Sequence, residues 1–338
     1  MPWYTIGIGI AGLAVLLVVL LTAISYYFYN IAIKRNAKDF LSGNPDLAQI
    51  QSDGNEAEGP SSLAGAFESA PMVETGAEWV EKQSYETLRI TSHDGLRLVG
   101  YYLAAKNPTN HIVILAHGYS AQGKDMGIIA KFYYEKLGFN VLMPDDRGHG
   151  SSDGNYIGFG WPDRKDYLQW IGKMLEVVGA RAQIALHGIS MGGATVMMVS
   201  GEQLPKQVKV IVEDCGYTSV HDQLRYQLKR IYKLPAFPIL SATSLLTRLL
   251  AGYRFKEASA LTQLEKNKLP TLFIHGSEDT FVPVEMVWRL YEACKADKAC
   301  YIAEGAGHGL AYATNTPAYE QAVVDFIGRH MRVGQSPA

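Results

Sequence analysis

The sequence predicts an α/β domain with a mostly parallel central sheet and helices on both faces, preceded by one membrane-spanning helix. Two observations lead to this fold class. Downstream of Trp79, short strand-like runs alternate with segments of helical periodicity, which is typical of parallel sheets. Before Lys34 there is no charged side chain, and the apolar run is long enough to cross a bilayer.

The expected elements follow one another regularly from residue 85 onward. Two strand-like runs, 85–92 and 96–103, flank the turn His93-Asp94-Gly95 and predict a hairpin. The order after the hairpin is strand 111–116, helix 124–137, strand 139–144, helix 162–178, strand 183–187, helix 191–203, strand 209–214, strand 270–276, helix 284–296, strand 299–304 and helix 317–331. We therefore expect an antiparallel pair at the start of an otherwise parallel sheet.

Residues 5–29 are predicted to cross the cell membrane once, as an uncleaved helix. Tyrosines cluster at the end of this apolar stretch, where an aromatic belt would lie. A buried core helix and a cleaved signal peptide are the alternatives, but a basic leader and a convincing cleavage site are both absent. Lys34, Arg35 and Lys38 follow the helix, which favours a cytoplasmic domain and leaves an extracellular one open.

Residues 30–78 are interpreted as a juxtamembrane segment and linker. Residues 42–77 are rich in small and acidic residues and contain few large apolar ones, which favours a weakly ordered tether. A packed N-terminal extension is the alternative. The folded domain is then expected over residues 79–333.

Composition argues against several classes of protein. The chain has 338 residues, of which 48% are hydrophobic, so it can bury a substantial core. Its net charge is −2 and no basic stripe stands out, so we expect no nucleic-acid partner. The three cysteines, Cys215, Cys294 and Cys300, form neither a disulfide framework nor a zinc pattern, and we expect no metal or cofactor.

The stretch Gly188-Ile189-Ser190-Met191-Gly192 matches the pattern G-x-S-x-G, which is weak evidence by itself. Its context strengthens it, because Ser190 lies between a predicted strand and a predicted helix, as a nucleophile elbow requires. The glycines permit a sharp turn with close backbone approach. The helix N-terminus behind Ser190 favours a developing anion. Ser190 is therefore predicted to be a nucleophile.

A serine nucleophile needs a base and an acid that orients the base, in the chain order Ser, acid, His. His308 lies in GAGHG, between the last strand and the last helix, and is the predicted base. Asp279 lies just past the carboxyl end of a strand, where functional groups of open α/β sheets collect, and is the predicted acid. Glu278 and Asp214 compete with Asp279 for this role.

Four segments together resemble the α/β-hydrolase superfamily over residues 85–332. They are HGYS at 117–120, DDRGHGSSDG at 145–154, GISMGG at 188–193, and the pair HGSEDTFVP and GAGHG. Within the superfamily the chain is similar to membrane-anchored bacterial serine hydrolases with a short cap, and more loosely to feruloyl or cinnamoyl esterases. The resemblance implies an α/β-hydrolase fold with Ser190 as nucleophile, Asp279 as acid and His308 as base.

Two backbone N–H groups are expected to form the oxyanion hole. One should come from Met191, next to the nucleophile, and the second from the loop after strand 111–116, at Tyr119. Asp146, Arg147 and His149 look reactive, but no triad position needs them. In the α/β-hydrolase superfamily, which the chain resembles, the loop that holds these three residues mainly braces the site.

Residues 217–263 interrupt the sheet and are expected to form a small cap over Ser190, with helices around 219–232 and 237–251. Its basic side chains are either a solvated face or a contact for anionic headgroups. The side chains expected to be available for lining an acyl pocket are Leu228, Ile231, Tyr232, Phe237, Leu245, Leu246, Leu249 and Leu250.

The expected function is a serine hydrolase of the carboxylesterase or lipase kind, which cleaves an ester or related acyl bond through an acyl-enzyme. The substrate would be a small-molecule or lipid-like acyl compound, and the N-terminal helix would attach the enzyme to a membrane. A serine peptidase or amidase, a thioesterase and a non-catalytic ligand-binding protein are the alternatives.

Overall fold

The computed structural model describes residues 3–36, 38 and 75–331. Eight strands form one sheet in the order β1-β2-β4-β3-β5-β6-β7-β8. They are β1 (Glu86–Thr91), β2 (Arg97–Leu103), β3 (His111–Ala116), β4 (Asn140–Pro144), β5 (Gln183–Ile189), β6 (Val208–Asp214), β7 (Thr271–Gly276) and β8 (Lys298–Ala303). β2 pairs antiparallel with β1 and β4, and every other pairing is parallel. The prediction of a parallel sheet opened by an antiparallel hairpin is confirmed.

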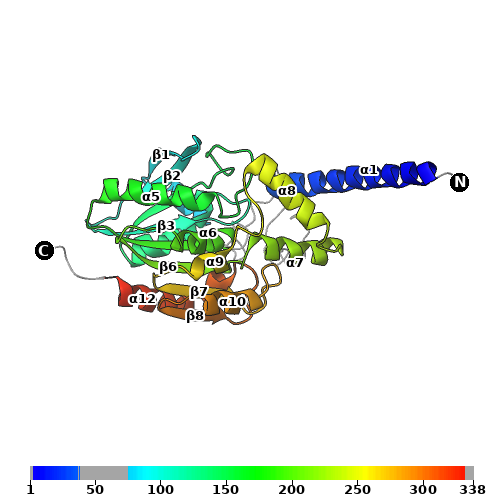
Figure 1. Cartoon of the computed structure of the whole chain (residues 1–338). Coiled ribbons are helices and arrows are strands. Elements are labelled where there is room, and N and C mark those ends of the chain that lie inside the picture. The colour runs from blue at the N-terminus through cyan, green and yellow to red at the C-terminus, as the bar shows by residue number, and fades with distance from the viewer. Residues whose placement is uncertain (1–2, 37, 39–74, 332–338) are drawn as a thin grey trace.

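Helices cover both faces of the sheet (Figure 1). The α-helices are α1 (Trp3–Phe28), α3 (Gly76–Glu81), α4 (Gly127–Lys131), α5 (Asp163–Val178), α6 (Met191–Ser200), α7 (Val220–Tyr232), α8 (Ile239–Ala251), α9 (Ala260–Leu264), α10 (Glu285–Ala293), α11 (Ala311–Thr314) and α12 (Thr316–His330). Three further short helices are not α-helical: η1 (Tyr29–Ile33) and η5 (Phe132–Lys136) are π-helices, and η4 (Gly123–Met126) is a 3₁₀-helix.

The predicted single helix over 124–137 is wrong in detail, because η4, α4 and η5 share this stretch. Close packing of two glycines accompanies the break. A Cβ placed on Gly127 would lie 1.9 Å from the carbonyl oxygen of Gly76, at the start of α3. The chain therefore reaches a backbone-to-backbone contact that hydropathy patterns do not encode.

Side chains along one strand show how the two faces are built. Val113 and Leu115 of β3 pack in the cluster that holds Phe326 of α12, whereas Ile112 and Ile114 pack in the cluster that holds Trp170 of α5. All six residues of β3 are buried, which explains its continuous apolar run.

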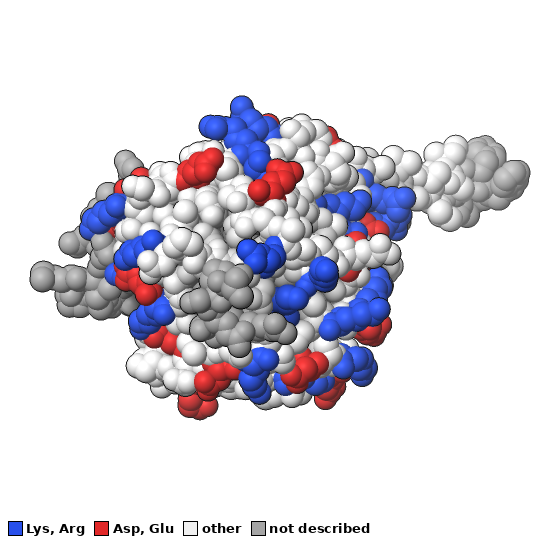
Figure 2. Space-filling view, turned by 90° about the vertical axis from the view of Figure 1, so that its left-hand side faces the viewer, with Lys and Arg blue, Asp and Glu red and all other residues white. Residues whose placement is uncertain are grey.

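Among the described residues, one helix is long and apolar enough to span a membrane. α1 projects from the body of the molecule (Figure 1) and contains no Lys, Arg, Asp or Glu. The same projection is uncharged in Figure 2, and on the face seen there basic and acidic side chains are otherwise interspersed.

The start of the expected linker packs on the domain instead of leaving it. Tyr29 and Ile33 of η1 are buried, with exposed fractions of 7% and 0%. The backbone of this segment pairs with the loop after β4, since Ile157 N donates to Ile33 O at 2.7 Å and Arg35 N donates to Asn155 O at 2.9 Å. Residues 37 and 39–74, which hold most of the predicted tether, lie outside the described residues.

The predicted cap is present between β6 and β7, and α7 and α8 are its two main helices. The Ser219 side chain caps α7 by accepting from Asp222 N at 3.0 Å. Both helices lie on the side of the molecule from which α1 projects, and α8 packs along α1 (Figure 1). α1 and the cap therefore pack against each other.

Candidate active site

Ser190 occupies a sharp turn between β5 and α6. Its φ of 58° and ψ of −115° are unusual for a residue with a side chain, and its N–H donates to Asp214 O at 2.7 Å. A Cβ on Gly188 would lie 2.1 Å from Gly192 O, and one on Gly192 would lie 1.9 Å from Ala116 O. The glycines of G-x-S-x-G are thus required by contacts within this turn and with β3.

The structure brings the predicted residues Ser190, His308 and Asp279 together. Ser190 Oγ lies 2.8 Å from His308 Nε2, and His308 Nδ1 lies 2.7 Å from Asp279 Oδ2. All three residues are 5% exposed. An ionised carboxylate only accepts hydrogen bonds, so His308 Nδ1 carries the proton and Nε2 is free to accept from the serine hydroxyl.

Asp279 is held on both carboxylate oxygens. Oδ1 accepts from Phe281 N at 2.9 Å and from Val282 N at 2.8 Å. Oδ2 faces His308 and also His275, whose Nε2 lies 3.3 Å away and donates to Val282 O at 2.8 Å. Burial would raise the pKa of Asp279, but the two histidines outweigh burial and hold its pKa below the usual range. Asp279 is therefore ionised at neutral pH.

His275 is a contact that the sequence reasoning missed. We expected it only to end an apolar strand, where most histidines are packed and inactive. The available signal was its position at the end of β7, four residues before Asp279, because both then lie at the same sheet edge. His275 touches the acid and not the base, so it can position Asp279 without entering the proton transfer.

The two competing acids lie elsewhere. Glu278 is exposed to solvent. Asp214 is buried, and its Oδ2 accepts from the Tyr319 hydroxyl at 2.9 Å. Burial raises the pKa of Asp214 to about 6, in spite of the Tyr319 hydrogen bond. Among the described contacts, the carboxylate that accepts a hydrogen bond from His308 belongs to Asp279.

The two residues predicted for the oxyanion hole flank the serine from different elements. Met191 is the first residue of α6, so its N–H is one of the unpaired groups at a helix N-terminus. Tyr119 follows β3, and its hydroxyl donates to Ala32 O at 2.8 Å while its ring packs 5.2 Å from that of Phe159. The segment after α1 therefore holds the Tyr119 side chain in place. The role of the two N–H groups stays a prediction.

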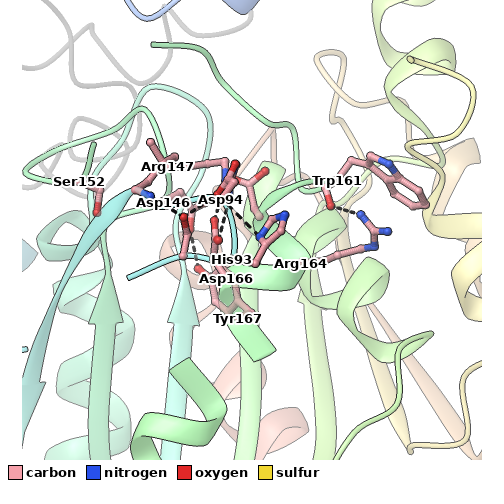
Figure 3. A network of polar contacts seen from close by, with 12 residues as sticks. His93, Asp94, Asp146, Arg147, Ser152, Trp161, Arg164, Asp166 and Tyr167 are labelled. Atoms are coloured by element: carbon pink, nitrogen blue, oxygen red, sulfur yellow. Dashed lines mark hydrogen bonds and ion pairs between the residues drawn. The ribbon is translucent and has the colours of Figure 1, made fainter. Parts of the chain in front are cut away.

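The loop after β4 is tied to neighbouring elements by a network of charged and polar contacts (Figure 3). Arg147 is 1% exposed, and its Nε and Nη2 lie 2.6 and 2.7 Å from the Asp166 carboxylate of α5. Its Nη1 lies 2.8 Å from Asp94 in the β1–β2 turn. The Tyr167 hydroxyl donates to Asp146 at 2.8 Å. These contacts brace the loop and pair the Arg147 guanidinium and one oxygen of the Asp146 carboxylate.

Two clusters of described residues have ligand atoms close enough to share a metal ion. They are Cys215 with Asp279 and His308, and His93 with Asp94 and Asp166. Burial raises the pKa of the Cys215 thiol, and a neutral thiol is a poor metal ligand. In the second cluster, the Arg147 guanidinium already neutralises the two aspartates. Neither donor set therefore favours a cation.

A pocket with mostly apolar walls opens at Ser190. Three of the eight cap side chains predicted to line such a pocket do so: Leu228, Ile231 and Tyr232. For four others the suggestion was wrong, because they are exposed: Phe237, Leu245, Leu249 and Leu250. The sequence reasoning missed the opposite wall, to which Phe28 and the η1 residues Ile31, Ala32 and Ile33 contribute. The hydropathy pattern alone predicts that these four residues belong to a membrane-spanning helix and a linker.

Comparison with known proteins identifies the family of the chain. Residues 128–334 match the prolyl oligopeptidase family. The protein YqkD of Bacillus subtilis is 32% identical over 254 residues, which cover 74% of this chain and 80% of YqkD. The membrane protein YNL320W of Saccharomyces cerevisiae is 24% identical over 211 residues, which cover 62% of this chain and 68% of the yeast protein. The Pyrococcus furiosus esterase Pf2001 superposes with a TM-score of 0.60 at 25% identity, covering 74% of this chain and 92% of the esterase. The chain therefore belongs to the prolyl oligopeptidase family, within the α/β-hydrolase superfamily.

Proposed function

We propose that this hydrolase cleaves esters of apolar acyl groups by covalent catalysis, with Ser190 as nucleophile, His308 as base and Asp279 as the acid that orients His308. The observation that carries the proposal is the placement of the serine. Ser190 Oγ, already hydrogen-bonded to His308, faces a pocket with apolar walls. A reacting carbonyl at Ser190 would leave its acyl chain in that pocket.

The proposed reaction uses the hydrogen bonds in order. As Ser190 Oγ attacks the acyl carbonyl, its proton passes to His308 Nε2, and Asp279 stabilises the resulting imidazolium. The negative charge on the carbonyl oxygen faces the N–H groups of Met191 and Tyr119. His308 Nε2 then gives its proton to the leaving alkoxide, and the acyl-enzyme forms. Water attacks the acyl-enzyme with the same two proton transfers, which releases the acid and restores Ser190.

The pocket supports an ester with an apolar acyl chain over a peptide. No charged side chain is among the described residues that line it. A peptide would place polar amide groups and charged ends against these walls, where unpaired polar groups cost free energy. Each methylene of an acyl chain instead gains about 0.8 kcal/mol on burial, which is roughly fourfold in binding.

The proposal is tested with the detergent-solubilised full chain. We expect a fluorophosphonate probe to label the wild type and not Ser190→Ala. With p-nitrophenyl esters, kcat/KM should rise roughly fourfold per methylene until the pocket is full. Amides and thioesters of the same acyl group provide the comparison. Faster cleavage of the amide would establish a peptidase, faster cleavage of the thioester a thioesterase, and ligand binding without labelling a binding protein.

We also propose that α1 anchors the enzyme in the cell membrane as a single span, with the catalytic domain on the cytoplasmic side. The support is the length and composition of α1, together with Lys34, Arg35 and Lys38 behind it. Protease added to intact spheroplasts should leave the domain uncut. Digestion from outside would place the domain on the extracellular side.

A further inference from the structure

The outer surface of the cap is unusually apolar for a surface in contact with water. Outside α1, nine large hydrophobic side chains of the described residues are exposed, and six of them lie in the cap: Ile231, Leu234, Phe237, Leu245, Leu249 and Leu250. Phe237 and Leu249 are the most exposed, at 78% and 74%. We define these six residues as the cap face. A concentration of large exposed apolar side chains in one small part of the fold indicates a site of interaction.

α8 has apolar side chains both on its inner side and on its outer side, where they lie among the exposed Ser241 and Arg248. Its inner side packs Ile239, Leu240 and Thr243 into the molecule, while Leu245 and Leu249, four residues apart, share the outer side. A helix covering a water-soluble domain would carry polar residues on its outer side. The outer leucines of α8 therefore need an apolar environment that the domain does not supply.

The membrane helix shows what that environment is. From Trp3 to Leu20, α1 rises about 27 Å, and the hydrocarbon core of a bilayer is about 30 Å thick. Contact with the domain begins at Leu21 and continues through Ser25, which is 2% exposed. For a span that begins at Trp3, the hydrocarbon would end close to the turn of α1 where burial by the domain begins, and α8 packs against α1. The cap is held at the level of the headgroups.

Charge and ring contacts agree with this position. The exposed cap side chains Arg225, Lys229, Lys233 and Arg248 are basic. Basic residues beside an apolar surface suit anionic headgroups. The Phe28 ring meets the Tyr232 ring edge-on, with centroids 5.1 Å apart, so α1 and α7 adjoin at the same level.

We propose that the cap face lies in the bilayer interface and that the acyl chain of a membrane-resident ester enters the pocket from the bilayer, between the end of α1 and the cap. The pocket is continuous with this boundary, because Phe28 and Ile31 line it on one side and Ile231 and Tyr232 on the other. Ser190, which is 5% exposed, also lines the pocket. The inference rests on the proposed function for its chemistry and names the source of the substrate, a lipid-like ester already dissolved in the membrane.

The first test measures where the cap face lies. The full chain is reconstituted in vesicles of phosphatidylcholine and phosphatidylglycerol, with a fluorescent label on Phe237→Cys in a Cys300→Ser background; the other two cysteines are buried. We expect nitroxide-labelled lipids to quench the label and aqueous iodide not to. Quenching by iodide alone would overturn the docking. If neither quencher reaches the label and the protein has the size of a dimer, the cap face contacts a second copy of the chain. This result would also overturn the docking in the bilayer.

The second test measures the route of the substrate. The double variant Leu245→Asn, Leu249→Asn should lower hydrolysis of a long-chain fluorogenic ester in vesicles at least tenfold and leave p-nitrophenyl acetate hydrolysis unchanged. Val177→Asn, Val324→Asn is the matched control, since both valines are exposed on helices outside the cap, at 39% and 36%. Equal loss on both substrates, or no loss on the vesicle ester, would refute the route. Absence of activity in the wild type on every ester would instead refute the proposed function.

Discussion

Replacing Gly192 by alanine should disable the active site by pushing two backbones apart. A Cβ at Gly192 would lie 1.9 Å from Ala116 O, whereas ordinary contacts begin at about 3.4 Å. β3 and the start of α6 must therefore separate by roughly 1.5 Å. Met191 precedes Gly192, and Tyr119 follows Ala116 by three residues, so this separation widens the gap between the two proposed oxyanion donors.

The size of the effect follows from this displacement. A hydrogen bond of about 2.9 Å that lengthens by more than 1 Å is lost, and loss of one oxyanion donor costs about 10²–10³ in kcat. Overpacking also costs about 1–3 kcal/mol of stability, equivalent to several degrees in Tm. We therefore expect kcat for p-nitrophenyl esters to fall at least a hundredfold in Gly192→Ala, with a lower Tm.

Gly172→Ala is the matched control, because Gly172 lies inside α5 and a Cβ there meets nothing within 4 Å. This variant should keep its kcat and gain about 1 kcal/mol of stability, since alanine favours a helix over glycine. Gly193→Ala should be intermediate, with its Cβ 2.9 Å from Asp214 O. A Gly192→Ala enzyme with wild-type kcat and Tm would refute the argument from backbone contact.

Three further predictions concern the polar groups around the site. Asp279→Asn should lower kcat about 10⁴-fold, because the amide favours the wrong tautomer of the base, while the exposed neighbour changed as Glu278→Gln should have wild-type kinetics. Burial raises the pKa of Glu213 to about 8 from 4.5, so wild-type stability should fall as pH rises between these values; Glu213→Gln should remove up to about 5 kcal/mol of that loss. Urea unfolding at pH 5 and pH 8 checks this, and a pH-independent difference between the two proteins would contradict it. Tyr119→Phe leaves the carbonyl of Ala32 without its donor and should cost about 1–3 kcal/mol, measured by the same unfolding assay.

The elements that the sequence predicted well are those whose signal is local. β3 reads as a continuous apolar run because both of its faces are buried, and Ser190 reads as an elbow because glycines flank it between a strand and a helix. Asp279 and His308 followed from chain order and from their positions after strands. The structure brings both to Ser190 with the hydrogen bonds that their proposed roles need.

What the sequence could not supply depends on contacts between distant segments. Phe28 and Ile31 have the hydropathy of a membrane helix, and only the packing of η1 against the cap makes them a wall of the pocket. Leu249 has the same hydropathy as the pocket residue Leu228, yet the orientation of α8 turns it outward. An amphipathic pattern gives the sides of a helix but not which side meets the protein and which meets lipid.

The hydrogen bond from Tyr119 to Ala32 has a consequence for producing this enzyme in soluble form. A polypeptide cut at the apparent edge of the domain, residue 79, would lose the fully buried Ile33 and the acceptor of the Tyr119 hydroxyl. Such a protein would keep Ser190, Asp279 and His308 in its sequence while one side of its pocket stood open to water. A shortened polypeptide should therefore begin upstream of Tyr29, so that η1 and the last turn of α1 remain packed on the domain.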